Sequence, residues 1–285
     1  MAFSGKTKVC GVIGDPIEHT LSPIMHNAAF EALKIDYVFL AFKVEVANVG
    51  KAIAGMRGLG IHGLNVTMPH KKSVVKYMDE LDPTAKTIAS VNTILNKDGK
   101  LFGFNTDGVG ALTALEQNGV VVKGKNIMLL GAGGAAKAIA YTLSQEADEL
   151  VILNRTPEPV KELANLLKQK FNKKINADAL TPKTVKDNLA KADVIINATS
   201  LGMEPKADQT PVAPEWLKPN LAVMDIVYNP LETKLAKDAK AAGAKVVSGV
   251  EMLIYQGAAS FEIWTACEAP VEVMRKAVLN QLIKV

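Results

Sequence analysis

The segment VVVKGKNIMLLGAGGAAKAIAYTLSQEADELVILNRT, residues 120–156, decides the fold of this chain. An apolar run from Ile127 to Leu130 ends at a glycine-rich turn, and helix-forming residues follow at once up to Leu143. A second apolar run, Leu150 to Leu153, ends in Asn-Arg-Thr. This order of strand, glycine turn, helix and strand is the context in which G-x-G-x-x-G/A indicates a dinucleotide site. The segment therefore predicts a Rossmann-type parallel sheet.

Each small residue of the turn has a physical task. Gly131 permits the tight turn, Gly133 lets the backbone approach a pyrophosphate, and Ala136 lets the helix lie close on the sheet. The anion is then expected at the helix N-terminus, where unpaired N–H groups and the helix dipole favour negative charge. A plain turn is the alternative, and the flanking strands and helix argue against it. The predicted cofactor residues of the turn are Gly131, Ala132, Gly133, Gly134, Ala135 and Ala136.

The end of the second strand indicates which cofactor binds. An NAD site usually carries Asp or Glu about 20 residues on, to accept from the ribose 2′-OH. Here Asn154 is followed by Arg155 and Thr156. A neutral amide beside a guanidinium and a hydroxyl suits a 2′-phosphate, which a carboxylate would repel. The sequence predicts NADP rather than NAD. The alternative is that Arg155 is a solvated surface residue.

The composition limits the class of protein. The 285 residues are 48% hydrophobic and 22% charged, with a net charge of +4, so a globular protein with room for two domains is expected. The lysines are scattered without a basic stripe, which argues against nucleic acid. The two cysteines lie far apart, and no Cys/His cluster has zinc spacing. No apolar run has the length of a signal core or a membrane span. A cytoplasmic, metal-free monomer or homodimer is expected.

The N-terminal part predicts an irregular α/β arrangement. Strands are expected over 9–14, 37–44 and 63–67, and a hairpin over 91–105 that turns at Asp98-Gly99. Ser22 is expected to be the N-cap of a helix over 23–33. Further helices are expected over 46–57, from Pro69 onward, over 83–89 and over 105–118.

The remaining chain alternates helix and strand. After a helix to about 171, strands are expected near 175–177, 193–197, 221–227 and 246–247. The stretch 251–283 predicts two helices split near Pro270. The fold class is therefore α/β with two domains. Residues 1–106, completed by 250–285, are expected to form a substrate-binding domain, and 107–249 the NADP-binding Rossmann domain.

Polar residues of the N-terminal domain stand at junctions of loops and elements. Thr20 and Ser22 are neighbouring hydroxyls at a helix start and suit an anionic group. Lys71 and Asp107 form an acid/base pair if they meet in space, because the carboxylate would orient an ammonium that gives and takes a proton. The alternatives are that the hydroxyls are only caps, that Lys71 is solvated, and that Asp107 only caps the next helix.

Other polar residues of this domain are less decisive. Asn65 and Thr67 lie along the strand that leads to Lys71, and Asn92 lies at the start of the hairpin. The histidines show no ligand spacing. We expect those at 19 and 26 to shape a loop, and those at 62 and 70 to be surface or packing residues.

Nine segments in chain order carry a resemblance to a known family: GDPIEHTLSPIMHN, GLNVTMPHK, ASVNTI, GFNTDG, GAGGAAKAIA, NRT, NATSLGM, DIVYNP and GVEMLIYQG. Together they extend along almost the whole chain, and it resembles shikimate dehydrogenase. The resemblance implies an enzyme that reduces 3-dehydroshikimate to shikimate with NADPH, on the path to chorismate and the aromatic amino acids. It also implies a cleft between a substrate domain and a Rossmann domain.

The resemblance also implies roles for single residues. Thr20, where the family more often has Ser, and Ser22 would hold the substrate carboxylate. Lys71 would be the catalytic lysine, paired with Asp107. The ring hydroxyls would be bound by Asn65, Thr67, Asn92, Asp107 and Gln256, and Tyr228 would reach the substrate from the cofactor domain. NADP would be bound by residues 131–136 with Asn154, Arg155 and Thr156, and its nicotinamide side would be lined by Thr199, Ser200, Met203, Val227, Gly249 and Met252.

One departure bears on the cofactor. Many members carry a second Arg shortly after the NRT motif, and Pro159 stands there in this chain. Arg155 would then carry more of the discrimination between NADP and NAD. Two rival functions stay open: a quinate/shikimate dehydrogenase that uses NAD, and a ligand sensor that kept the fold and lost the chemistry. The retained Lys71 and Asp107 argue against the sensor.

Overall fold

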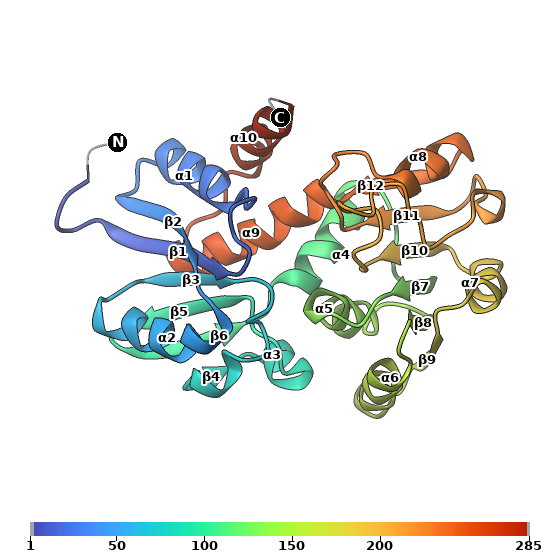
Figure 1. Cartoon of the computed structure of the whole chain (residues 1–285), viewed down its shortest axis with the longest axis horizontal. Coiled ribbons are helices and arrows are strands. Elements are labelled where there is room, and N and C mark those ends of the chain that lie inside the picture. The colour runs from blue at the N-terminus through green and yellow to red at the C-terminus, as the bar shows by residue number, and fades with distance from the viewer. Residues whose placement is uncertain (1–2, 284–285) are drawn as a thin grey trace. The chain divides into compact units, whose positions relative to one another are not determined.

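The computed structural model describes residues 3–283 and has an α/β fold with two compact units (Figure 1). The first unit comprises the described residues up to Asp107 and those from Ile254 onward. The second unit comprises Gly108–Leu253. Each unit is built on a sheet of its own, so the chain leaves the first unit once and later returns to it.

The sheet of the first unit is mixed and has the order β2-β1-β3-β5-β6-β4. Its strands are β1 (Lys8–Gly14), β2 (Tyr37–Lys43), β3 (Gly63–Val66), β4 (Glu80–Leu81), β5 (Thr93–Lys97) and β6 (Lys100–Phe104). β1 pairs in parallel with β2 and β3, and β5 pairs antiparallel with β3 and β6. Asp98 and Gly99 have φ values of 51° and 86°, as a two-residue hairpin turn requires. The expected hairpin is thus confirmed.

Helices surround the first unit's sheet, and the last of them packs on the first. They are α1 (Ser22–Ala32), α2 (Val49–Gly58), α3 (Pro83–Ile88) and α10 (Val271–Ile283), with 3₁₀ turns η1 (Val46–Asn48) and η2 (Val75–Tyr77). Asp82 caps α3, because its carboxylate accepts from the backbone N–H of Ala85 at 2.6 Å. α9 (Gly249–Thr265) begins in the second unit and continues into the first. The expected split of the C-terminal stretch near Pro270 is confirmed.

Two expectations for this unit are wrong. Ser22 is not the N-cap of α1: it is the first helical residue, and the N-cap is Leu21, whose side chain makes no capping hydrogen bond. No α-helix begins at Pro69 either. The backbone N–H of His70 bonds to Thr67 O, and its ring bonds to Val44 O at 2.6 Å. These bonds hold the segment in a run of turns that leads to η2.

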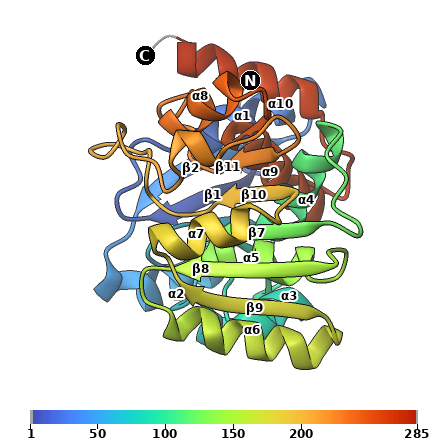
Figure 2. The ribbon, with the colours of Figure 1, turned by 90° about the vertical axis from the view of Figure 1, so that its right-hand side faces the viewer.

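The sheet of the second unit is parallel throughout and has the order β12-β11-β10-β7-β8-β9 (Figure 2). Its strands are β7 (Asn126–Leu130), β8 (Glu149–Asn154), β9 (Lys174–Ala179), β10 (Val194–Asn197), β11 (Ala222–Asp225) and β12 (Lys245–Ser248). Sheet order reverses between β7 and β10, which is where parallel α/β sheets bind their ligands. The expected Rossmann-type sheet is confirmed.

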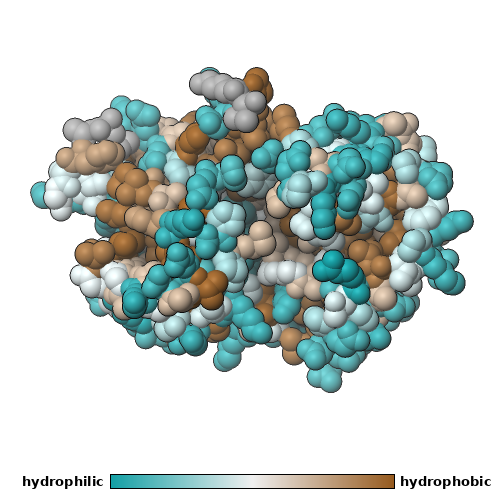
Figure 3. All heavy atoms as spheres, viewed as in Figure 1, coloured by the Kyte–Doolittle hydropathy of each residue, from teal (hydrophilic) through white to brown (hydrophobic). Residues whose placement is uncertain are grey.

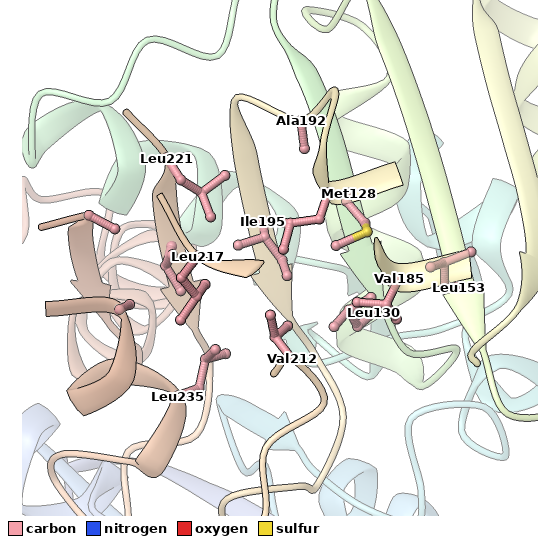
Figure 4. Packing of buried hydrophobic residues seen from close by; sticks show 14 residues of the cluster. Met128, Leu130, Leu153, Val185, Ala192, Ile195, Val212, Leu217, Leu221 and Leu235 are labelled. Atoms are coloured by element: carbon pink, nitrogen blue, oxygen red, sulfur yellow. The ribbon is translucent and has the colours of Figure 1, made fainter. Parts of the chain in front are cut away.

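Helices join these strands. They are α4 (Asp107–Gln117), α5 (Gly134–Leu143), α6 (Glu158–Phe171), α7 (Pro182–Leu189) and α8 (Lys234–Ala241), with a 3₁₀ turn η3 (Pro214–Trp216). Figure 4 shows the buried cluster on one face of the sheet, to which Met128 and Ile195 contribute from paired strands, Val185 from α7 and Leu235 from α8. All four side chains are at most 1% exposed. This core fixes the strand ends that carry the loops described below.

Polar and apolar side chains are mixed on the surface. On the face seen in Figure 3, apolar patches are interrupted by hydrophilic residues in both units. Within residues 3–283, no helix has the length and apolar character needed to cross a membrane. Cys10 is buried and Cys267 is exposed, and both are free thiols.

Candidate functional site

The structure brings Lys71 and Asp107 together in the first unit. Lys71 lies in the turns after β3, and Asp107 is the first residue of α4. The Lys71 Nζ donates to Asp107 Oδ2 at 2.6 Å. The carboxylate side chain is 5% exposed and the lysine side chain 18%. A buried carboxylate therefore fixes an ammonium that has two further N–H donors to offer a ligand.

Asn92 fixes the same carboxylate from its other side. Its Nδ2 donates to Asp107 Oδ1 at 2.9 Å, and its Oδ1 accepts from the backbone N–H of Thr106 at 2.8 Å. The backbone N–H of Asp107 donates to Asn105 Oδ1 at 3.1 Å. Both oxygens of Asp107 thus have a donor. The lysine, the aspartate and the amide form one hydrogen-bonded group.

Thr20 and Ser22 lie side by side at the start of α1. The Thr20 hydroxyl donates to Ser22 Oγ at 3.3 Å and accepts from the Ser22 backbone N–H at 3.3 Å. Ser22 is buried and Thr20 is half-buried. At the start of α1 the Ser22 N–H is bonded to Thr20, Pro23 has no N–H, and the Met25 N–H bonds to Leu21 O, so the two hydroxyls are the main groups that this end can offer to an anion.

The remaining predicted residues of this unit lie in different positions. Asn65 is buried in β3, and its Nδ2 donates to the backbone oxygen of Asn92 at 3.2 Å, within the interior of the unit. Thr67 follows β3 and is half-buried. Gln256 is on α9, and Asn92 Nδ2 lies 3.4 Å from its Oε1. The structure thus joins Asn92, Gln256, Lys71 and Asp107 directly, and places Asn65 behind them.

Three buried hydroxyls behind this group escaped the sequence analysis. They belong to Thr93, Thr106 and Ser260, which are at most 3% exposed. Thr106 is next to Asp107 in the GFNTDG segment and Thr93 next to Asn92 in ASVNTI. Ser260 is one helical turn after Gln256. Its spacing of four residues from a predicted ligand residue is the one signal that could have indicated it.

In the second unit the glycine turn connects β7 to α5. Gly131 has a φ of 120°, and a Cβ there would lie 2.5 Å from Ala198 O. Gly133 is exposed, precedes α5, and would meet nothing within 4 Å if it carried a Cβ. Ala136 is 1% exposed against the sheet. The turn leaves the N-terminus of a ten-residue helix open to an anion, and these residues fit a dinucleotide pyrophosphate.

The residues expected to select the cofactor follow β8. Asn154 is half-buried, and its Nδ2 donates to Thr156 O at 2.8 Å. Arg155 and Thr156 are exposed, and so is Pro159 on the first turn of α6. A guanidinium on this loop, with a hydroxyl beside it and no carboxylate at 154–156, suits a second phosphate.

Two further loops follow β10 and β11. Thr199 is held by Asn197, whose Oδ1 accepts from the Thr199 N–H at 3.1 Å and from its hydroxyl at 2.7 Å. Asp225 accepts from Asn197 Nδ2 at 2.9 Å and from the backbone N–H of Val227 at 3.1 Å. Burial raises the pKa of Asp225, and its hydrogen bonds oppose that shift. Sequence analysis missed Asp225, which ties the two loops together.

The other expected residues of this unit lie on the same loops or on α9. Ser200 and Met203 are exposed, while Val227 and Met252 are buried. Tyr228 is half-buried, and burial raises its pKa. A Cβ on Gly249 would lie 2.6 Å from Ile226 O, so the start of α9 passes close to the β11 loop.

The histidines and possible metal ligands lie apart from these groups. His26 is 0% exposed and stacks on Phe39 with ring centroids 4.4 Å apart. His70 bonds to Val44 O and His62 to Trp264 O, so both have structural partners. Within the described residues, no three His, Cys, Asp or Glu side chains gather as a metal ion would need.

A parallel sheet with a glycine-rich turn, joined in one chain to an α/β unit that holds a lysine–aspartate pair, defines the class of nicotinamide-nucleotide dehydrogenases. Within that class the chain belongs to the shikimate dehydrogenase family. Three family models match: the shikimate dehydrogenase substrate binding domain over residues 12–94, shikimate / quinate 5-dehydrogenase over 113–214, and the shikimate 5'-dehydrogenase C-terminal domain over 249–279. The resemblance found in the sequence is confirmed.

Relatives match along their whole length. The NADP(+) shikimate dehydrogenase of Methanocaldococcus jannaschii is 48% identical over 283 residues, which cover 99% of this chain and 100% of the relative. A crystal structure of a shikimate dehydrogenase in complex with NADP+ is 46% identical with a TM-score of 0.92, covering 99% and 98% of the two chains. The enzyme of Listeria monocytogenes, in complex with shikimate and NAD, is 36% identical with a TM-score of 0.91, covering 97% and 98%.

Proposed function

We propose that this protein catalyses the reversible NADPH-dependent reduction of 3-dehydroshikimate to shikimate, on the path to chorismate and the aromatic amino acids. The full-length relatives that bear the name of this activity support the proposal. The observation that carries it is the ion pair of Lys71 and Asp107, 2.6 Å long and fixed by Asn92. A reductase needs such a proton donor beside the oxygen that changes charge.

The chemistry divides between cofactor and protein. Bound NADPH supplies the hydride that adds to the carbonyl carbon. As the oxygen gains charge, the Lys71 ammonium gives it a proton, and in the reverse direction the neutral amine takes that proton back. Asp107 keeps the ammonium in place through its short hydrogen bond. Hydride and proton together convert the ketone to the secondary alcohol.

We assign substrate binding to the first unit. The hydroxyls of Thr20 and Ser22 would bind the carboxylate of the substrate. The ring hydroxyls would be bound by Thr67, Asn92, Asp107 and Gln256. Asn65 would act behind these contacts, because its amide nitrogen already donates inward.

We assign NADP to the second unit. The turn 131–136 would hold the pyrophosphate, and Asn154, Arg155 and Thr156 the 2′-phosphate. The nicotinamide side would be lined by Thr199, Ser200, Met203, Val227, Gly249 and Met252. The exposed guanidinium of Arg155 supports NADP, since charge-assisted bonds to phosphate are among the stronger protein contacts.

Steady-state kinetics with shikimate or quinate, each with NADP or NAD, tests the proposal. We expect kcat/KM to be highest for shikimate with NADP. If quinate with NAD gives the highest value, the protein is the quinate-type dehydrogenase. If shikimate binds in calorimetry and neither cofactor is reduced, the protein is a sensor and the proposed function is wrong.

Arg155→Ala tests the choice of cofactor. Loss of a charge-assisted bond to the 2′-phosphate should lower kcat/KM for NADP by about 10- to 100-fold and leave the NAD value nearly unchanged. Lys168→Ala, an exposed cation at the other end of α6, is the matched control and should alter neither value. Equal losses with both cofactors would remove Arg155 from phosphate recognition.

We further propose that the protein works in the cytoplasm as a monomer or a homodimer. Its free cysteines suit a reducing compartment. Light scattering on the purified protein distinguishes the two states.

A further inference from the structure

Ser260 is 0% exposed, yet its hydroxyl lies within hydrogen-bond distance of several polar groups. Its Oγ lies 2.8 Å from Thr93 Oγ1, 3.2 Å from Thr106 Oγ1 and 3.1 Å from Asn65 Nδ2. We propose that Ser260 is a positioning residue that holds Asn92 and Asp107 in their substrate-binding arrangement through the Thr93 hydroxyl. The inference rests on the proposed function.

The donor and the acceptor of each hydrogen bond can be assigned, because some of the partners can only donate and others can only accept. The backbone N–H of Thr106 can only donate, and it faces Asn92 Oδ1 at 2.8 Å. The Asp107 carboxylate, paired with the lysine ammonium, can only accept, and it faces Asn92 Nδ2 at 2.9 Å. The amide of Asn92 therefore has a single orientation.

The hydroxyl protons follow in turn. Thr93 Oγ1 lies 2.9 Å from Asn92 Oδ1, which has no proton, so Thr93 must donate there. A hydroxyl has one proton, so at its 2.8 Å contact with Ser260 the threonine can only accept. The Ser260 hydroxyl has two acceptors for its one proton, Thr93 Oγ1 at 2.8 Å and the backbone oxygen of Gln256 at 3.0 Å. We assign the proton to Thr93, because that contact is the shorter one and because the Gln256 oxygen already lies in the backbone hydrogen-bond ladder of α9. Asn65 Nδ2 can only donate, so the Ser260 oxygen accepts its hydrogen bond at 3.1 Å.

The result is a one-way series of donors that ends at the carboxylate: Asn65 to Ser260, Ser260 to Thr93, Thr93 to Asn92, and Asn92 to Asp107. Ser260 is four residues after Gln256 on α9, so one helix supplies both a group beside Asn92 and the support behind it. Removal of the Ser260 hydroxyl frees Thr93 to turn its proton away from Asn92. The amide and the carboxylate that it holds then lose their fixed orientation.

Ser260→Ala should therefore weaken binding of the substrate and spare the cofactor. Leaving buried donors without a partner should raise KM for shikimate by about tenfold, while KM for NADP changes by less than about twofold. Thr93→Val, which keeps the shape and removes the hydroxyl, should have the same effect, and Thr93→Ser should restore the wild-type KM. Thermal unfolding of each variant separates a loss of stability from this change in KM.

The double variant Ser260→Ala/Thr93→Val gives the sharpest measurement. Residues that act in one series are not additive, so its KM for shikimate should match that of Thr93→Val alone. Multiplicative effects, or a lower melting temperature with an unchanged KM, would overturn the inference and leave the proposed function intact. If wild-type protein fails to reduce NADP with shikimate in the same assay, the function and the inference both fail.

Discussion

At the scale of single residues, the proposed chemistry depends on a lysine whose long side chain is held in one place. A free lysine loses rotamer entropy when it is fixed, and a 2.6 Å bond to a carboxylate that is 5% exposed offsets that cost. Because Asp107 also accepts from Asn92, it cannot turn to follow the lysine. The ammonium is therefore positioned before any ligand binds, which is what a proton donor in a transition state requires.

Lys71→Ala should lower kcat far more than it raises KM, because the proton transfer belongs to the transition state. General acid–base help is typically worth about 10²–10⁴-fold, and a loss of that size in kcat is expected. Lys72→Ala changes the exposed neighbour and serves as the control. Steady-state kinetics in both directions checks this, and an unchanged kcat for Lys71→Ala would exclude the lysine from the mechanism.

His26 shows how a titratable group can be used as an aromatic ring. It is 0% exposed and lies among Phe30, Phe39, Phe261 and Trp264, with centroid distances of 4.4–6.5 Å. Burial lowers the pKa of His26 to about 3, against a small opposing effect of Asn65. The ring is therefore neutral in the folded protein at any pH at which the enzyme would work.

This lowered pKa makes stability depend on pH. Between about pH 6.5 and about pH 3 the unfolded chain binds a proton at His26 that the folded protein does not. The contribution of neutral His26 to the free energy of unfolding is thus complete above about pH 6.5. It is lost as the pH falls, by up to about 1.4 kcal/mol per pH unit. His26→Phe should remove that part of the slope in urea unfolding from pH 7 to 4, whereas His19→Gln, at an exposed position, should keep it. Equal slopes in wild type and His26→Phe would contradict the shift.

Single residues differ in how well the sequence predicts them. Lys71 and Asp107 could be expected because both are charged residues in the polar segments that follow a strand, NVTMPHK and GFNTDG. Ser260 could not, because it is one hydroxyl in a mostly apolar helix and its bond to Thr93 spans 167 positions. Asn65 was expected to contact the substrate. Only the fold reveals that its amide nitrogen faces inward.

At the scale of elements, glycine stands at two positions of one turn for two different physical reasons. Gly131 combines a φ of 120°, which L side chains rarely adopt, with backbone of Ala198 at 2.5 Å from the place of a Cβ. Gly133 has extended dihedrals and open space around it. Gly131 is required by the packing of β7 against the end of β10, whereas the fold does not require Gly133, and we assign it to the close approach of the dinucleotide.

The two alanine variants should therefore separate stability from binding. Gly131→Ala should cost about 2–5 kcal/mol of unfolding free energy, the sum of left-handed strain and overpacking. Gly133→Ala should leave the stability of the ligand-free protein within about 0.5 kcal/mol and yet weaken NADP binding by about tenfold or more, because its Cβ would face the pyrophosphate that we assign to this turn. Denaturant unfolding and calorimetry with NADP measure both, and full NADP affinity in Gly133→Ala would refute the assigned role.

Elements were predictable where local chemistry and tertiary packing agree. The Asp98-Gly99 hairpin and the Asp82 cap follow from dihedral and capping preferences. The helix expected at Pro69 failed because tertiary bonds of His70 hold turns there. Two short helices, α7 and α8, fit the expected alternation of helix and strand, but the sequence analysis gave them no residue range, although Thr181 and Thr233 cap them. Short amphipathic helices carry too few apolar residues for a clear period.

At the scale of the whole molecule, each of the two units has a tryptophan of its own, so the unfolding of each unit can be followed by fluorescence. The two tryptophans are Trp216 in the second unit and Trp264 in the first. Trp264 is 3% exposed, and its Nε1 donates to Ile94 O at 3.0 Å. A Cβ on Gly63 would lie 2.5 Å from that ring, so the returning helix α9 is part of the first unit's core. Fluorescence of Trp264 therefore follows the unit to which we assign substrate binding.

Ligands should shift the unfolding of the two units differently. A ligand that binds only the folded form stabilises it by about 2.7 kcal/mol at a concentration of 100 Kd. In Trp264→Phe protein, the Trp216 signal should move to higher denaturant with NADP. In Trp216→Phe protein, the Trp264 signal should move further with shikimate than with NADP. Each variant is compared with itself without ligand, so any cost of the substitution cancels. An equal shift of both transitions with NADP alone would contradict this prediction and show that the two units unfold together. The helices α4 and α9, which continue from one unit into the other, would then be the connection that couples them.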